Sequence, residues 1–152
     1  MPGNFLDSNV LLYLIGSDSR KANRAEELLR QGGTVSIQVL NEIANVARRK
    51  LNLSWEKTKL LIADIDQFLE VIPLTRSVHN RGLDLAEQHG FAIYDAMIIA
   101  SALEEDCDVV FTEDMHHGMR IDGRLTIVNP FLAAALSPAH LADQLPLVVA
   151  NG

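Results

Sequence analysis

The sequence contains one cysteine, no apolar run long enough to span a bilayer, and no signal-peptide pattern at its start. Cys107 cannot form an internal disulfide and has no second thiol with which to build a cysteine metal site, so we expect it to be a buried small hydrophobic residue. Residues 1–4 lack the basic region and apolar run of a secretion signal. These absences predict a cytoplasmic protein that has no membrane partner.

Basic residues are also scarce, because 13 Lys and Arg stand against 20 Asp and Glu and give a formal net charge of −7. A broad basic groove that holds nucleic acid by counterion release is therefore disfavoured. A local basic rim, a nucleic acid held partly through metal ions, or a basic partner protein remains compatible with this charge. The 152 residues are about one domain's worth and are long enough to bury a core.

Short apolar runs alternate with segments of helical periodicity. We predict strands at 4–6, 34–36, 71–74, 107–112 and 125–128, and helices at 10–15, 20–31, 37–50, 54–69, 75–89 and 91–103. Ser54 and Thr75 are the expected N-caps of two of these helices. Strands separated by helices imply an α/β fold, with a short parallel sheet covered by helices on both faces.

Two acidic residues lie in helical segments that are otherwise apolar. Asp95 is the only charged residue of segment 91–103 and shares its face with apolar residues three, four and seven positions later. Glu42 is the only acidic residue of segment 36–50 and shares a stripe with two valines. Such charges need compensation. Each acid also has a structural alternative to a functional role. Asp95 could cap its helix, and Glu42 could pair with one of the following arginines, 48 or 49.

Two further carboxylates follow predicted strands, Asp7 after the first and Asp114 after the strand at 107–112. Ligands of open α/β sheets bind beyond the carboxyl ends of the strands, so all four acids could meet there. Alternatively, Asp7 and Asp114 could cap the turns that follow their strands. Converging carboxylates repel one another unless a cation neutralises them, and oxygen ligands without thiols suit Mg²⁺ or Mn²⁺. Such ions assist attack of water on a phosphodiester. If the acids converge, the chemistry indicates a phosphodiester hydrolase.

Each acid lies in a block with its own hydrophobic context. The blocks are FLDSNVLLY (5–13), SIQVLNE (36–42), YDAMIIASA (94–102) and FTEDM (111–115). In this order they resemble the PIN-domain ribonucleases, and most closely the VapC-type toxins of bacterial toxin–antitoxin pairs. The resemblance runs from about Asn4 to Phe131, which is nearly the whole chain.

The resemblance implies a PIN-like three-layer sandwich over residues 1–132 and a C-terminal tail, 133–152, that could form a short helix. It places the catalytic and metal-binding acids at Asp7, Glu42, Asp95 and Asp114, with Asn9 and Thr112 in support. Ser8 stands where the family often has Thr and keeps a hydroxyl. Glu113 adjoins Asp114, so the choice between them for the fourth acid stays open.

Toxins of this family cleave RNA, usually dimerise, and are held inactive by an antitoxin whose C-terminal segment occupies the groove near the acids. The resemblance therefore implies an endoribonuclease dependent on Mg²⁺ or Mn²⁺, with an RNA substrate, a cognate antitoxin and a homodimeric state. A PIN nuclease for RNA processing and a PIN-fold binding module without turnover are the alternatives. A DNA or flap substrate also stays open, because attack by water does not require a 2′-hydroxyl.

Other candidate residues have weaker support. His116 and His117 adjoin Asp114, but a convincing transition-metal site needs three or four converging ligands. Two basic groups could contact RNA phosphates or an antitoxin, namely residues 48–50 and the set Arg20, Lys21 and Arg24. The start at residues 7–10 is also similar to haloacid-dehalogenase-like phosphatases, but the second Asp and a convincing Lys partner are absent.

Overall fold

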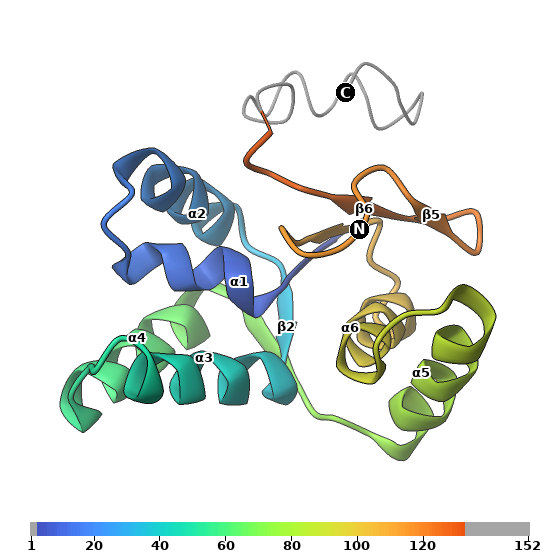
Figure 1. The fold of residues 1–152 in the computed structure, drawn as a ribbon, viewed down its shortest axis with the longest axis horizontal. Helices are drawn as coiled ribbons and strands as arrows, with labels where there is room; N and C mark the ends of the chain where they lie inside the picture. Colours follow the sequence, from blue (N-terminus) through green and yellow to red (C-terminus); the bar gives the residue numbers. More distant parts are fainter. Residues whose placement is uncertain (1–2, 133–152) are drawn as a thin grey trace.

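Short strands and the helices between them make up most of residues 3–132, the part of the chain that the computed structural model describes (Figure 1). In chain order the elements are β1 (Asn4–Leu6), α1 (Ser8–Leu11), the 3₁₀ helix η1 (Leu12–Ile15), α2 (Ser19–Gln31), β2 (Thr34–Ser36), α3 (Ile37–Arg49), α4 (Trp55–Phe68), β3 (Glu70–Ile72), α5 (Arg76–His89), α6 (Ile93–Glu104), β4 (Val109–Phe111), β5 (Arg120–Ile121) and β6 (Leu125–Val128). The predicted tail, 133–152, lies outside the described residues.

The strands form one sheet in the order β3-β2-β1-β4-β6-β5. Neighbouring strands are parallel except for β5, which pairs antiparallel with β6. The predicted α/β sandwich with a short parallel sheet is therefore confirmed, with one addition. Strand β5 was not predicted, because two residues are too few to show a periodic pattern. A turn with positive φ at Asp122 and Gly123 connects it to β6.

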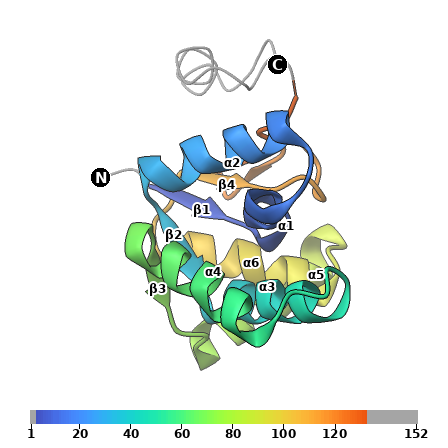
Figure 2. The same cartoon turned by 90° about the vertical axis from the view of Figure 1, so that its left-hand side faces the viewer.

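The central strands are buried because helices cover both faces of the sheet. Figure 2 shows α2 on one side of β1 and β4, and α6 on the other. Phe5, Val110 and Ile127 from β1, β4 and β6 are fully buried, and all four residues of β6 are buried. Burial on both faces is typical of parallel strands and explains why these segments appear as continuous apolar runs. Among residues 3–132 there is no helix of the length and apolarity that a membrane crossing needs.

Local capping signals account for most helix boundaries. Ser54 and Thr75 accept hydrogen bonds from backbone N–H groups at the starts of α4 and α5, as predicted. Gly90 ends α5 in the left-handed region, at φ 77°. Strand β3 ends at Ile72, because Pro73, where the sequence predicts that the strand leaves the sheet, has no N–H to continue a ladder.

The strand order reverses between β1 and β4. From β1 the sheet continues through β2 to β3 on one side, and from β4 to β6 on the other. Leu6 is in register with Phe111, and the backbone N–H of Asp7 donates to the Phe111 carbonyl oxygen at 3.0 Å. The carboxyl ends of these two strands therefore lie side by side at a switch point, where open α/β sheets bind ligands.

Candidate active site

Asp7 is held at this switch point by hydrogen bonds from three residues. It is the N-cap of α1, where its carboxylate accepts from the Ser8 backbone N–H at 2.7 Å, from the Thr112 hydroxyl at 2.8 Å and from the Asn9 amide at 3.3 Å. Only 5% of the residue is exposed. Burial raises the pKa of the Asp7 carboxyl from 3.8 to about 6. The nearby charges of Asp95 and Asp114 add to this rise, and the hydrogen bonds from Thr112 and Ser8 oppose it. Asp7 is therefore both the N-cap of α1 and a buried acid whose negative charge is incompletely compensated.

Glu42 lies on α3 and reaches toward the same point. Its carboxylate accepts from the Ser8 hydroxyl at 3.1 Å, so Ser8 connects it to Asp7. Burial and then the charge of Asp7 raise the pKa of Glu42, while hydrogen bonds from Ser8 and Gln38 lower it. Within residues 3–132 Glu42 has no ion pair. The alternative that Glu42 pairs with an arginine is therefore wrong.

Asp95 lies in the first turn of α6 and is half-buried. The N-cap of this helix is Ala92, and no side chain makes a capping hydrogen bond there. The helix-cap alternative for Asp95 is therefore wrong, although its place in the first turn still faces the positive end of the helix dipole. Burial and then the charge of Asp114 raise the pKa of Asp95.

Glu113 and Asp114 are adjacent, but their carboxylates have different surroundings. Glu113 accepts from the Tyr13 hydroxyl at 2.5 Å and forms an ion pair with Lys21. Asp114 is exposed, and its charge contributes to the raised pKa values of Asp7 and Asp95. Asp114 also lines, together with Asp95, a cavity of about 590 Å³. Asp114 therefore shares a cavity with Asp95, whereas Glu113 is held by Tyr13 and Lys21.

Asn9 and Thr112 connect the ends of β1 and β4. The Asn9 amide donates to the Thr112 hydroxyl oxygen at 3.1 Å, and its carbonyl oxygen accepts from the Glu113 backbone N–H at 3.0 Å. The Asp114 N–H donates to the same Thr112 oxygen at 3.3 Å. Both residues thus connect Asp7 to the loop that carries Asp114.

Three further residues contribute to this arrangement through contacts that the sequence did not predict. Ser8 joins Asp7 to Glu42, and its position beside Asp7 was the available signal. Tyr13 and Lys21 hold Glu113 from about a hundred residues away in the chain. No local pattern marks such a distant contact.

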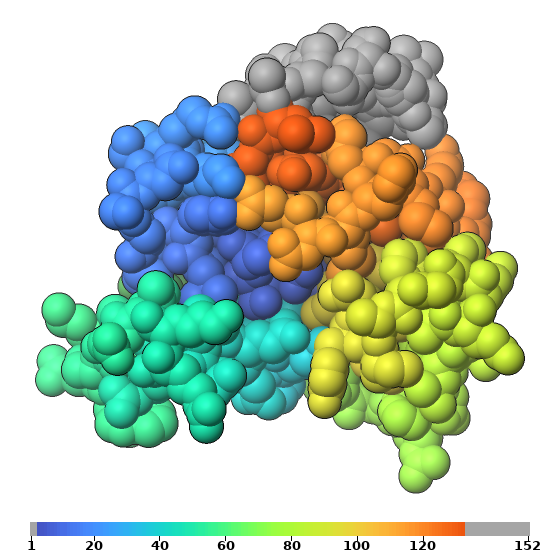
Figure 3. All heavy atoms as spheres, viewed as in Figure 1, coloured from blue at the N-terminus to red at the C-terminus, as the bar shows by residue number. Residues whose placement is uncertain are grey.

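The four acids come from four separate parts of the chain. Figure 3 shows the start of the chain, the segment around residue 42, the start of α6 and the chain after β4 meeting on one face. Carboxylate oxygens are suitable ligands for Mg²⁺ or Mn²⁺, and three raised pKa values indicate negative charge that a cation would relieve. Among residues 3–132, however, no three Asp, Glu, His or Cys side chains are close enough together to hold a metal ion. The donor set fits a divalent cation in its chemistry, and the side chains would have to draw together to bind one.

Several of the other polar candidates make contacts within the fold. His117 accepts from the Asn129 backbone N–H at 2.9 Å, which uses one ring nitrogen within the fold. Arg20 and the buried Arg24 donate to carbonyl oxygens of the chain after β6, while Lys21 binds Glu113. These basic side chains therefore connect α2 to the chain after β6 and to Glu113.

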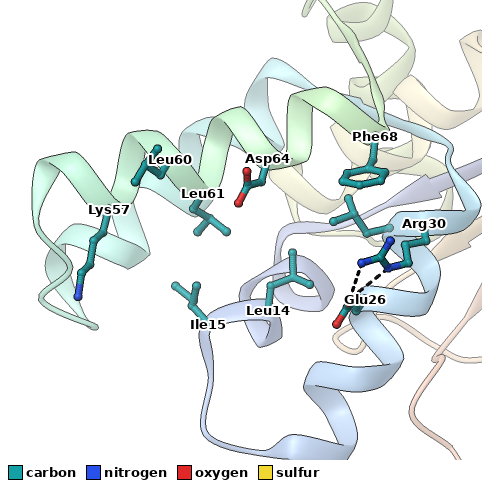
Figure 4. A pocket seen from close by; sticks show the side chains of 10 residues that line it. Leu14, Ile15, Glu26, Arg30, Lys57, Leu60, Leu61, Asp64 and Phe68 are labelled. Atoms are coloured by element: carbon teal, nitrogen blue, oxygen red, sulfur yellow. Dashed lines mark hydrogen bonds and ion pairs between the residues drawn. The ribbon is translucent and has the colours of Figure 1, made fainter.

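A groove of about 470 Å³ is lined by none of the four acids (Figure 4). Leu61 from α4 points toward Leu14 from η1, Leu60 lies beside it on α4, and Phe68 lies at the end of α4 (Figure 4). Leu60 is 57% exposed and Phe68 is 42% exposed, so the groove presents apolar surface to solvent. The Glu26–Arg30 ion pair lies at its rim, with an N–O distance of 2.9 Å.

Comparison with known proteins agrees with this fold. The family model of the PIN domain matches residues 5–117. A toxin–antitoxin complex from Klebsiella pneumoniae superposes with a TM-score of 0.65 at 18% identity, covering 84% of this chain and 98% of that one. DNA-bound VapBC from Salmonella typhimurium gives 0.61 at 22% identity, with 84% and 98% covered. VapC20 of Mycobacterium tuberculosis, a toxin that cleaves the sarcin–ricin loop, gives 0.58 at 16% identity, with 73% and 89% covered. No curated protein matches the chain significantly.

Proposed function

Because the chain belongs to the PIN-domain family, we propose that it is an endoribonuclease that depends on Mg²⁺ or Mn²⁺ and hydrolyses RNA phosphodiester bonds. One observation carries the proposal. Four carboxylates from separate elements gather at the switch point of the sheet, and three of them have pKa values raised by burial and by one another's charge. A fold that keeps such mutually repelling groups together is more easily explained by a cation site than by stability.

In this proposal Asp7, Glu42, Asp95 and Asp114 would hold the cation. When bound, a divalent ion of this kind stabilises charge on a phosphoryl group and makes water a competent nucleophile at neutral pH. The Thr112 hydroxyl and the Ser8 N–H hold the Asp7 carboxylate in place from two sides, and Thr112 also holds the backbone of Asp114. These contacts orient the Asp7 carboxylate before any ligand binds, which lowers the cost of assembling the site.

The test is cleavage of a mixture of tRNA and rRNA by the purified protein in the presence of Mn²⁺ or Mg²⁺. We expect discrete fragments with the wild type, and none with EDTA or with Asp95→Asn. Asp84→Asn is the matched control, because Asp84 is an exposed acid on α5 outside the site, and this variant should cleave like the wild type. Fragments that persist in EDTA or in Asp95→Asn would refute the proposal.

A binding module without turnover is the second candidate. It is favoured by the spacing of the acids, since no three potential ligands within residues 3–132 are close enough together to hold a metal ion. A thermal-shift titration with Mn²⁺ separates the two functions. A nuclease site gains stability as Mn²⁺ binds the folded state, whereas a module that has lost the ion does not respond.

The proposal extends to the role of toxin in a toxin–antitoxin pair that forms homodimers. Support comes from the structural neighbours, several of which are toxin–antitoxin complexes. The apolar groove of Figure 4 offers a docking surface for an antitoxin segment, because Leu60 and Phe68 are exposed there. A short apolar helix could cover both side chains.

Co-expression with the product of an adjacent small reading frame tests the toxin role. The antitoxin should co-purify with the chain, suppress its cleavage of RNA, and lose affinity when Leu60 is changed to Asp. A chain without such a neighbour, or one whose activity the neighbour leaves unchanged, would instead indicate a PIN nuclease for RNA processing. Light scattering of the purified chain measures whether it is a dimer.

A further inference from the structure

A second cavity adjoins the acids, on the side of Glu42. Its volume is about 400 Å³, and it is lined by Gln38, Asn41, Glu42, Asn45, Leu74 and Tyr94. The first four of these residues are spaced three, four and seven apart along α3, so they share one face of that helix. Tyr94 lies at the start of α6, directly before Asp95. The cavity is therefore bordered by two elements that carry acids of the candidate active site.

The aromatic ring of Tyr94 is unusually exposed for its size. The residue is 70% exposed, and Leu74 across the same cavity is 48% exposed. The buried Gln38 side chain donates to the Tyr94 carbonyl oxygen at 3.1 Å and so holds the backbone at this point. The fold thus fixes the start of α6 while leaving the ring itself open to solvent.

The amides of Asn41 and Asn45 are free to bind a ligand. Both residues are exposed, and neither side chain makes a hydrogen bond to another group within residues 3–132. Each amide offers two donor hydrogens and one acceptor oxygen. An apolar ring beside unpaired amides is the combination that recognises a heteroaromatic base with polar edges.

The charge of the cavity favours a base over a phosphate. Its lining contains no Lys or Arg, and its only charged side chain is the carboxylate of Glu42. A phosphate would be repelled there, whereas a neutral base would not. The backbone of a nucleic acid would then lie over the acids, where a cation compensates its charge, with a base turned toward α3.

We propose that this cavity binds one unpaired nucleobase of the RNA strand, stacked on Tyr94 and hydrogen-bonded by Asn41 and Asn45, next to the bond that is cut. This inference rests on the proposed nuclease function. It explains how the site would select single-stranded RNA. Stacking needs an unpaired base, so an RNA duplex would not present one to the ring.

The test measures binding separately from hydrolysis. A short single-stranded RNA containing 2-aminopurine is titrated with protein in the presence of Mn²⁺, using Asp7→Asn as the background so that hydrolysis does not consume the probe. Stacking on Tyr94 should quench the 2-aminopurine fluorescence. Adding Tyr94→Ala should weaken binding about tenfold or more and abolish the quenching, whereas Tyr94→Phe, which keeps the ring, should bind within about twofold.

Ile93→Ala is the matched control, because Ile93 is the neighbouring residue, is 48% exposed and does not line the cavity. Equal binding by the Tyr94→Ala and Ile93→Ala proteins would overturn the inference, as would a failure of every variant to bind the RNA. A change of oligomeric state in Tyr94→Ala with unchanged RNA affinity would also overturn it and assign the ring to an interface between copies. If the wild type cuts no RNA but the quenching still depends on Tyr94, the base-binding site is supported and the nuclease function is rejected.

Discussion

Replacing Asp7 by Asn should change how the stability of the metal-free protein depends on pH. The pKa of Asp7 is raised by burial from 3.8 to about 6 in the folded state. The folded protein therefore binds this proton more tightly than the unfolded chain does. The stability that the protonated carboxyl contributes is complete below pH 4 and is lost as the pH rises through 6. An Asn side chain does not titrate, so the variant lacks this loss.

The size of the effect follows from the shift in pKa. Each unit corresponds to 1.36 kcal/mol, so the rise to about 6 costs the wild type about 3 kcal/mol of folding free energy once the pH is well above 6. Between pH 4 and pH 7.5 we expect the difference in stability between variant and wild type to move by about 2 kcal/mol in favour of the variant. Asn also alters the hydrogen bonds from Thr112 and Asn9, but that contribution does not vary with pH and cancels in the comparison.

The assay is urea unfolding of both proteins in EDTA at several values between pH 4 and pH 7.5. Asp84→Asn, an exposed change on α5, corrects for loss of a carboxylate far from the site. Saturating Mn²⁺ should reverse the order at pH 7.5, because it stabilises the wild type and has less effect on the variant. A stability difference that does not change with pH would refute the reasoning that Asp7 is buried with an uncompensated charge.

Three further substitutions test individual contacts of the fold. Thr112→Val removes the hydroxyl that donates to Asp7 at 2.8 Å, and it should raise the pKa of Asp7 further and cost about 1–3 kcal/mol at pH 7.5, measured by urea unfolding. Gly33→Ala should cost about 2 kcal/mol or more and lower the melting temperature, because φ is +145° and an added Cβ would lie 2.5 Å from the Asn4 carbonyl oxygen; an unchanged melting temperature would contradict that contact. Ser54→Ala should cost about 1 kcal/mol by removing the N-cap of α4, and an Ser54→Asp variant, which keeps an acceptor, should retain most of that stability.

Much of this fold could be predicted from local patterns. The strands at 4–6, 34–36 and 125–128 have their predicted bounds, since apolar runs between polar turns mark them clearly. The environments of Asp95 and Glu42 were anomalous in the sequence itself, because a lone acid in an apolar helix face has no local partner. Strand β5 was missed because its pairing with β6, and not its own two residues, defines it.

The sequence by itself determined which segments form strands and helices and which acids stand in apolar surroundings, because these properties depend on residues a few positions apart. Only the tertiary structure showed that Glu113 and Asp114 have different surroundings. Lys21 and Tyr13, from another part of the chain, bind the first and leave the second facing Asp95. The cavity at Tyr94 also exists only where α3 and α6 meet. Contacts of this kind depend on packing between distant segments, and periodicity along the chain carries no information about them.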